Sequence, residues 1–194
     1  MTFAAEFVAF ARQALESLDT TAIERVAEEL WALRARGGRL FIVGVGGSAA
    51  NASHAVNDFR KLCDIEAYTP TDNVAELSAR TNDDGWETTF DAWLRTSRLS
   101  ANDLLLCLSV GGGARERNLS PNLVRALELA TERETPVVAV VGRDGGAAGR
   151  VARVAILVPT VEPTLITPLT EAFQSLILHL LVAHPRLQQN RATW

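Results

Sequence analysis

The sequence predicts an α/β fold, a three-layer αβα sandwich with a central parallel sheet and a helical N-terminal extension. Short apolar runs rich in Val, Ile and Leu recur at 39–44, 103–108, 136–141 and 154–158. Each run is continuous rather than alternating in polarity, which is typical of parallel strands buried on both faces. Helical stretches separate the runs, as the crossovers of a parallel sheet require.

Size and composition predict one soluble domain over residues 1–194. The chain is 47% hydrophobic and 22% charged, which excludes disordered and collagen-like proteins. A domain of this length buries roughly 70% of its unfolded surface, so it needs no disulfides. Cys63 and Cys107 are therefore predicted to be unpaired, as in a reducing cytoplasm.

Charge and hydropathy indicate no nucleic-acid or membrane partner. The formal net charge is −4, against the basic balance of a general nucleic-acid binder. No apolar run approaches the ~20 residues that span a bilayer, and no basic region precedes an apolar one at the N-terminus. We therefore expect a cytoplasmic protein.

Helices are predicted at both ends of the chain. Residues 1–36 form two helices, and Thr20 or Thr21 is the predicted N-cap of the second. The apolar face of this second helix comprises Ile23, Val26, Leu30 and Leu33. Residues 37–194 form the α/β core and a last apolar helix, with Thr167 as its N-cap and Pro168 at its first position.

Two glycine-rich segments follow predicted strands, Gly-Val-Gly-Gly-Ser at 44–48 and Ser-Val-Gly-Gly-Gly at 109–113. In open parallel sheets, ligands bind at the carboxyl ends of the strands. Glycines let backbone N–H groups approach an anion, and a following helix N-terminus favours negative charge. The third glycine of the dinucleotide fingerprint and the Gly-Lys-Ser/Thr of a P-loop are both absent. Tight turns explain the glycines equally well, but the nearby serines favour a small phosphorylated ligand.

Several short motifs occur in a fixed order along nearly the whole chain. They are Gly-Gly-Ser-Ala-Ala at 46–50 with His54, Asn-Asp at 82–83 with Gly85, Ser-Pro-Asn-Leu-Val-Arg-Ala-Leu at 120–127, and Gly-Arg-Asp-Gly-Gly at 142–146. Together they resemble the sugar isomerase (SIS) domain family, and more closely its phosphoheptose isomerase branch. The resemblance implies a homotetramer with sites between subunits. It also implies conversion of sedoheptulose 7-phosphate to D-glycero-D-manno-heptose 7-phosphate, through an enediol, for bacterial heptose biosynthesis.

The resemblance also implies a set of substrate-binding residues. Carried over by position, Ser48, Ser109 and Ser120 bind the phosphate, and Asp83 contacts sugar hydroxyls. Further substrate-binding positions are Gly47, Asn82, Gly111 and Asp144.

The segment between Ser109 and Ser120 departs from the family. The family has a compact Ser-Thr-Ser-Gly-Asn-Ser there, whereas residues 110–119 read Val-Gly-Gly-Gly-Ala-Arg-Glu-Arg-Asn-Leu. This longer segment removes hydroxyls and adds Arg115 and Arg117. Either arginine is a candidate to replace lost phosphate contacts; alternatively, both are solvated loop charges.

Four polar residues resemble the family's zinc and catalytic set, with Asp in place of Glu and Glu in place of Gln. His54 and Asp58 lie four residues apart on one predicted helix face, and Glu171 and His179 lie on the last helix. The resemblance implies that all four hold zinc, whose usual ligands include imidazole and carboxylate. It further implies that Asp58 and His179 share the proton transfers of the isomerisation.

Three members of this set also have a structural interpretation. Asp58 is one methylene shorter than Glu, about 1.5 Å, and pairing with Arg60 or Lys61 is its alternative role. Glu171 and His179 are about 12 Å apart along a helix and would share one metal only with extended side chains. Glu171 otherwise favours its helix dipole, and His179 otherwise is a hydrogen-bonded core residue.

The sequence therefore predicts a phosphoheptose isomerase-like aldose–ketose isomerase with a zinc cofactor. Two alternatives remain open. One is a catalytically inactive SIS domain that binds a phosphosugar or a protein as a scaffold. The other is an isomerase of a different phosphosugar, selected by the arginine-bearing loop.

Overall fold

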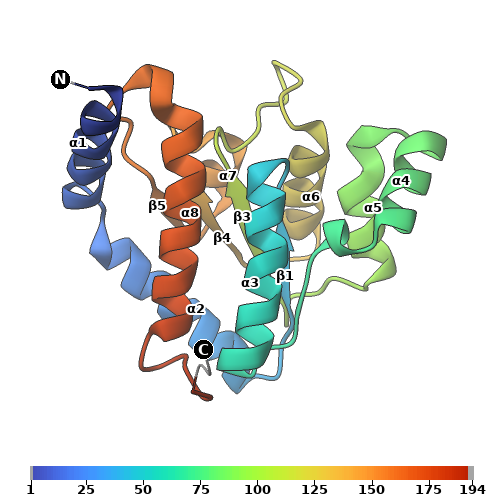
Figure 1. Ribbon diagram of the computed structural model, residues 1–194. Coiled ribbons are helices and arrows are strands. Elements are labelled where there is room, and N and C mark those ends of the chain that lie inside the picture. Colours follow the sequence, from blue (N-terminus) through green and yellow to red (C-terminus); the bar gives the residue numbers. More distant parts are fainter. Residues whose placement is uncertain (1, 192–194) are drawn as a thin grey trace.

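The computed structural model describes residues 2–191 and confirms the predicted α/β class. Parallel strands form one sheet in the order β2-β1-β3-β4-β5 (Figure 1). The strands are β1 (Leu40–Val43), β2 (Ala67–Tyr68), β3 (Leu104–Ser109), β4 (Val137–Val141) and β5 (Val154–Leu157). Each of the four predicted apolar runs is one of these strands.

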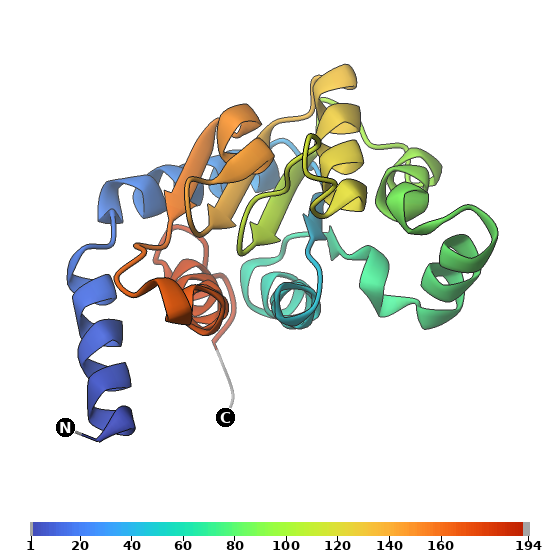
Figure 2. The ribbon, with the colours of Figure 1, turned by 90° about the horizontal axis from the view of Figure 1, so that it is seen from above.

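Helices cover both faces of the sheet and confirm the three layers (Figure 2). They are α1 (Phe3–Glu16), α2 (Thr20–Ala35), α3 (Gly47–Cys63), α4 (Val74–Asp83), α5 (Thr89–Thr96), α6 (Pro121–Glu132), α7 (Gly146–Val151) and α8 (Ile166–Ala183). Successive strand residues point to opposite faces. Leu40 and Ile42 pack into a core with α2, α3 and α8, whereas Phe41 and Val43 pack into a second core with α5, α6 and α7.

Both predicted helix starts are wrong by one or two residues. The N-cap of α2 is Asp19, whose Oδ1 accepts hydrogen bonds from the N–H groups of Thr21 (2.9 Å) and Ala22 (3.2 Å). A short 3-10 turn, Pro163–Leu165, leads directly into α8, so this helix starts before Thr167. Pro168 occupies its third position, where a backbone N–H has no partner within the helix in any case.

The sequence pattern predicts no element between Cys63 and Leu104, where the structure has β2, α4 and α5. Strand β2 has only two residues, and α4 buries none of its side chains. Neither element therefore carries an apolar pattern long enough to predict. Helix α4 lies at the outer edge of the molecule (Figure 1).

Helix α8 corrects the expectation about apolar runs. An 18-residue stretch within Pro163–Ala183 has a mean hydropathy of 1.5, and the segment is long and apolar enough, by length and composition alone, to cross a membrane. In the structure it packs against the sheet: Ile177 and Leu181 are fully buried, and the buried Gln174 donates to the Val140 carbonyl at 3.4 Å. These contacts are typical of the core helix of an α/β domain.

Cys63 and Cys107 are buried and unpaired, as predicted. Burial raises the pKa of Cys63 to about 11 and that of Cys107 to about 12. Because the thiolate is the reactive form, we expect neither thiol to react with a disulfide reagent at pH 8 in the folded protein. Both should react after denaturation, and the absorbance of the released thiolate measures this. Rapid modification of the native protein would contradict the burial of these thiols.

Candidate active site

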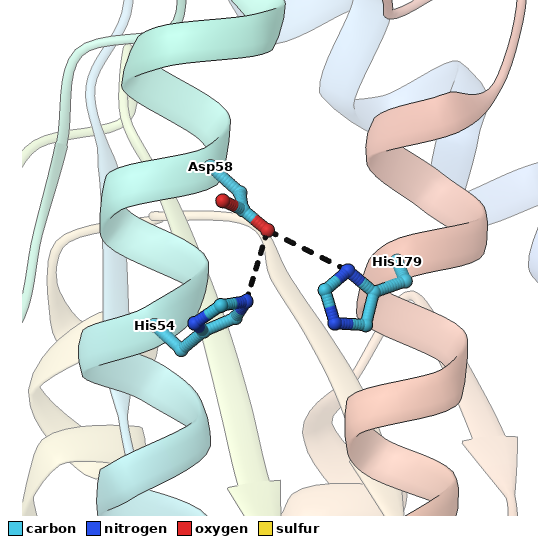
Figure 3. Close-up of side chains that lie close together, drawn as sticks. All are labelled: His54, Asp58 and His179. Atoms are coloured by element: carbon cyan, nitrogen blue, oxygen red, sulfur yellow. Dashed lines mark ion pairs between the residues drawn. The ribbon is translucent and has the colours of Figure 1, made fainter. Parts of the chain in front are cut away.

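Helices α3 and α8 lie side by side and bring His54, Asp58 and His179 together (Figure 3). Asp58 Oδ2 lies 3.1 Å from His54 Nε2 and 3.6 Å from His179 Nδ1. One ligand atom from each residue lies within 4.8 Å of the others. Three of the four residues that the sequence grouped therefore meet, and the shorter side chain of Asp58 reaches both imidazoles.

The carboxylate of this cluster is sheltered, while the imidazoles are open. The side chain of Asp58 is 14% exposed, against 52% for His54 and 50% for His179. Asp58 Oδ1 also accepts a hydrogen bond from Asn57 Nδ2 at 2.9 Å. This arrangement offers a small molecule or a cation a carboxylate flanked by two accessible imidazoles.

Two of the structural interpretations are wrong. His179 is half exposed rather than buried in the core. Arg60 donates to the Ala67 carbonyl at 3.2 Å and lies over the Tyr68 ring, and within residues 2–191 the ion pairs of Asp58 are those with the histidines. The side chains of His179 and Asp58 are therefore not occupied by the structural roles that these interpretations assign to them.

The donor set of the cluster fits a zinc ion. Two imidazole nitrogens and one carboxylate oxygen are ordinary zinc ligands. Three protein ligands with a further position left for water or substrate are typical of catalytic rather than structural zinc sites.

Glu171 lies outside this group. A Cβ atom at Gly47 would lie 2.4 Å from Glu171 Oε2, so the carboxylate occupies the space beside the first turn of α3. A negative charge there is favoured by the dipole of α3. Gly47, a predicted substrate-binding residue, thus provides room for Glu171, and Ser48 beside it is buried (1% exposed).

A separate pocket of about 290 Å³ opens at the carboxyl end of β3. It is lined by Ser109, Val110, Gly111, Gly113, Arg117, Leu119, Ser120, Arg143 and Thr167. The structure therefore brings together Ser109, Gly111, Arg117 and Ser120. Ser48, the third serine expected at the phosphate, is buried and is not among the residues that line this pocket.

Arg143 and Thr167 line the same pocket but were not among the predicted site residues. A signal for Arg143 was available, because it lies two residues after the Val137–Val141 run, in a Gly-Arg-Asp-Gly-Gly motif. Side chains just past the carboxyl ends of neighbouring parallel strands meet at one edge of the sheet.

Two glycine-rich loops interlock beside the pocket. Ala147 N–H donates to the Gly113 carbonyl and Ala148 N–H to the Gly112 carbonyl, both at 2.9 Å. A Cβ atom at Gly112 would lie 1.8 Å from the Gly145 carbonyl oxygen. Gly112 and Gly113 therefore serve close loop packing, which is the tight-turn interpretation. Ser109 Oγ accepts the Gly112 N–H at 3.0 Å, which leaves its own O–H to donate.

The two added arginines have different surroundings. Residues 114–119 form a small hairpin closed by an Ala114–Leu119 bridge. Arg115 turns away from the pocket and pairs with Glu128 of α6, with a distance of 2.8 Å from Nε to Oε1. Arg117 instead lines the pocket. Of the two candidates, the structure thus favours Arg117.

The remaining predicted residues do not meet these two sites. Asn82 and Asp83 are exposed at the end of α4, where Asn82 Nδ2 donates to Asp83 Oδ1 at 2.7 Å. Asp144 is exposed and accepts the Gly146 N–H at 3.2 Å, which stabilises the turn before α7. Their roles in substrate binding remain predictions.

Comparisons with known proteins agree with the fold and the motifs. A family model described as SIS domain matches residues 2–142. The chain is 38% identical over 159 residues to the lincomycin biosynthesis protein LmbN of Streptomyces lincolnensis, covering 76% of this chain and 56% of that protein, little more than half its length. It is 32% identical to the phosphoheptose isomerase of Geobacter sp. (strain M21), covering 75% and 72%. The structure of phosphoheptose isomerase GmhA from Neisseria gonorrhoeae superposes with a TM-score of 0.77 at 27% identity, covering 92% and 94%.

Proposed function

Because the chain belongs to the SIS domain family, in its phosphoheptose isomerase branch, we propose that it interconverts sedoheptulose 7-phosphate and D-glycero-D-manno-heptose 7-phosphate. The observation that carries the proposal is the position of Asp58 Oδ2 between the imidazoles of His54 and His179. A scaffold that only binds phosphosugars does not require a sheltered carboxylate between two open imidazoles.

The isomerisation moves one proton between adjacent carbons. A base removes a proton from C1 of the ketose, which gives an enediol, and return of a proton to C2 gives the aldose. Asp58 is the proposed base for the carbon-bound proton. His179 carries a proton between the O1 and O2 oxygens through Nε2, because its other ring nitrogen, Nδ1, faces Asp58.

Zinc is the proposed cofactor, held by His54, Asp58 and His179. When bound, the ion supplies a Lewis acid that stabilises negative charge on the substrate oxygens. Glu171 is left out of this ligand set because its carboxylate lies against Gly47.

The proposed complete site lies between subunits of a homotetramer. Thr167 lines the phosphate pocket, and His179 lies twelve residues further along α8, a rise of about 18 Å. A heptose phosphate spans roughly 10 Å, judged from its bond lengths. One ligand therefore does not readily join the pocket and the cluster of the same chain, which supports a site shared with a second subunit. A cytoplasmic location is part of this proposal, since it is where phosphorylated sugars are metabolised.

A second candidate is the isomerisation of a different phosphosugar. It is favoured by the 38% identity to a protein whose name refers to lincomycin biosynthesis rather than to a heptose isomerase, and by the inserted loop at 110–119. Turnover compared on pentose, hexose, heptose and longer ketose phosphates distinguishes the two substrates.

Proton NMR of sedoheptulose 7-phosphate in D2O, with zinc supplied and then with a chelator, tests the proposal. We expect an aldose anomeric signal, deuterium at C2, and loss of both after chelation. If the ketose stays unchanged and takes up no deuterium at C1, this substrate is wrong. Turnover that does not change when the chelator is added would exclude zinc as the cofactor.

A further inference from the structure

Arg117 and Arg143 stand apart from most arginines of the chain. Within residues 2–191, neither has an ion-pair or hydrogen-bond partner, whereas Arg115 and Arg125 pair with Glu128 and Glu87. Both line the pocket at the carboxyl end of β3, and no carboxylate is among its lining residues. The pocket therefore has two uncompensated positive charges.

Other donors of the pocket also favour an anion. The Ser109 hydroxyl is free to donate, since its oxygen already accepts the Gly112 N–H at 3.0 Å. Ser120 directly precedes α6, and Thr167 lies in the first turn of α8. Both helices therefore direct the positive ends of their dipoles towards this pocket.

The backbone holds Arg143 in place. Its φ of 53° is in the left-handed region that side-chain-bearing residues rarely adopt. Gly142 N–H donates to the Val110 carbonyl at 3.1 Å, and Gly145 N–H donates to the Gly142 carbonyl at 3.0 Å. The turn that carries Arg143 is thus bound to the end of β3, which fixes where its side chain starts relative to the pocket.

We propose that Arg117 and Arg143 form a two-arginine clamp for a phosphate dianion. The clamp makes charge the main determinant of affinity at this end of the substrate. Planar guanidinium groups match the oxygens of a phosphate with paired hydrogen bonds. Arg115 helps indirectly, because its pairing with Glu128 holds the hairpin from which Arg117 extends.

This inference rests on the proposed function only for the identity of the sugar. Calorimetric titration of the full chain with inorganic phosphate, at constant ionic strength, tests the clamp itself. Arg143→Gly is the main variant, because glycine adopts φ 53° without strain and the turn is preserved. We expect phosphate affinity to fall by about 10- to 100-fold in Arg143→Gly and in Arg117→Ala. Arg143→Lys should lie between these variants and the parent protein, because it keeps the charge but not the paired hydrogen bonds.

Arg150→Ala is the matched control. Arg150 is exposed on α7, has no ion-pair or hydrogen-bond partner within the described residues, and lies outside this pocket. Its loss changes the net charge equally and should leave affinity within twofold. Absence of phosphate binding to the parent protein, unchanged binding in both clamp variants, or an equal loss in Arg150→Ala would each overturn the clamp.

The two proposals fail in different ways. Arginine-dependent phosphate binding without turnover of sedoheptulose 7-phosphate would leave the clamp standing and reject the substrate. Turnover with a KM unchanged in Arg143→Gly would reject the clamp and leave the isomerase standing.

Discussion

Asp58→Asn is expected to lower isomerase turnover by about 100- to 10,000-fold, which is the usual contribution of a positioned general base. Asn has the same shape but no negative charge, so it neither removes a proton nor serves zinc as a charged ligand. Asp58 is the carboxylate that contacts both His54 (3.1 Å) and His179 (3.6 Å), and no other carboxylate joins this group within the described residues. Zinc bound per chain, measured by mass spectrometry after dialysis, should fall with turnover.

The control for this variant is Asp64→Asn, the same substitution six residues later. Asp64 is exposed at the end of α3 with φ 53°, a conformation that Asn tolerates well. It should retain turnover and zinc. Asp58→Glu tests whether the length of the side chain matters at this position, since Glu is the longer carboxylate of the family pattern. If Asp58→Asn stays within a fewfold of the parent protein, Asp58 is not the base.

The strands were predictable because burial on both faces requires a continuous run of apolar residues, which is visible in the sequence. A strand such as Val137–Val141, with every residue buried, has few alternatives to a central position in a sheet. Helix starts were less predictable, since neighbouring residues compete for the same N–H groups. Asp19 and Thr20 are both good N-caps, and only the path of the chain decides between them.

The histidine–aspartate cluster was predictable because two helical spacings and a family resemblance coincide at His54, Asp58 and His179. The position of Glu171 was not, since it depends on how α8 lies against the start of α3, where Gly47 leaves a space. Arg117 and Arg143 are contributed to one pocket by loops after different strands. Their meeting follows from the adjacency of β3 and β4, which a single sequence does not specify.

Gly112→Ala is expected to have the largest effect on stability, because two costs combine at this position. Its φ of 68° costs a side-chain-bearing residue about 1–2 kcal/mol. A Cβ atom there would lie 1.8 Å from the Gly145 carbonyl oxygen and 3.0 Å from the Gly146 nitrogen. These are backbone atoms, so the two interlocked loops must separate, which typically costs a further 1–3 kcal/mol.

Gly37→Ala separates the two costs. Gly37 has a nearly identical φ of 66°, but no atom lies within 4 Å of its hypothetical Cβ. Gly37→Ala therefore has only the backbone cost, and the difference in free energy of unfolding between the two variants measures loop packing alone. We expect Gly112→Ala to be about 1–3 kcal/mol less stable than Gly37→Ala in denaturant titrations at equal protein concentration. Equal free energies of unfolding would show that the two loops separate without loss of stability.

The same pair of variants links loop packing to ligand binding. The loop that carries Gly112 is hydrogen-bonded to the loop that carries Arg143, through Val110 and Gly142 at 3.1 Å and through Gly112 and Ala148 at 2.9 Å. Separating these loops moves the Arg143 guanidinium relative to Ser109, the last residue of β3. A shift of about 1 Å breaks the paired hydrogen bonds of a guanidinium with phosphate, whose N–O distances are about 2.7–2.9 Å. Gly112→Ala should therefore lose affinity for phosphate, whereas Gly37→Ala should keep it, since Gly37 lies far along the chain at the end of α2. A variant that is destabilised yet binds phosphate normally would show that the pocket does not depend on the interlocked loops.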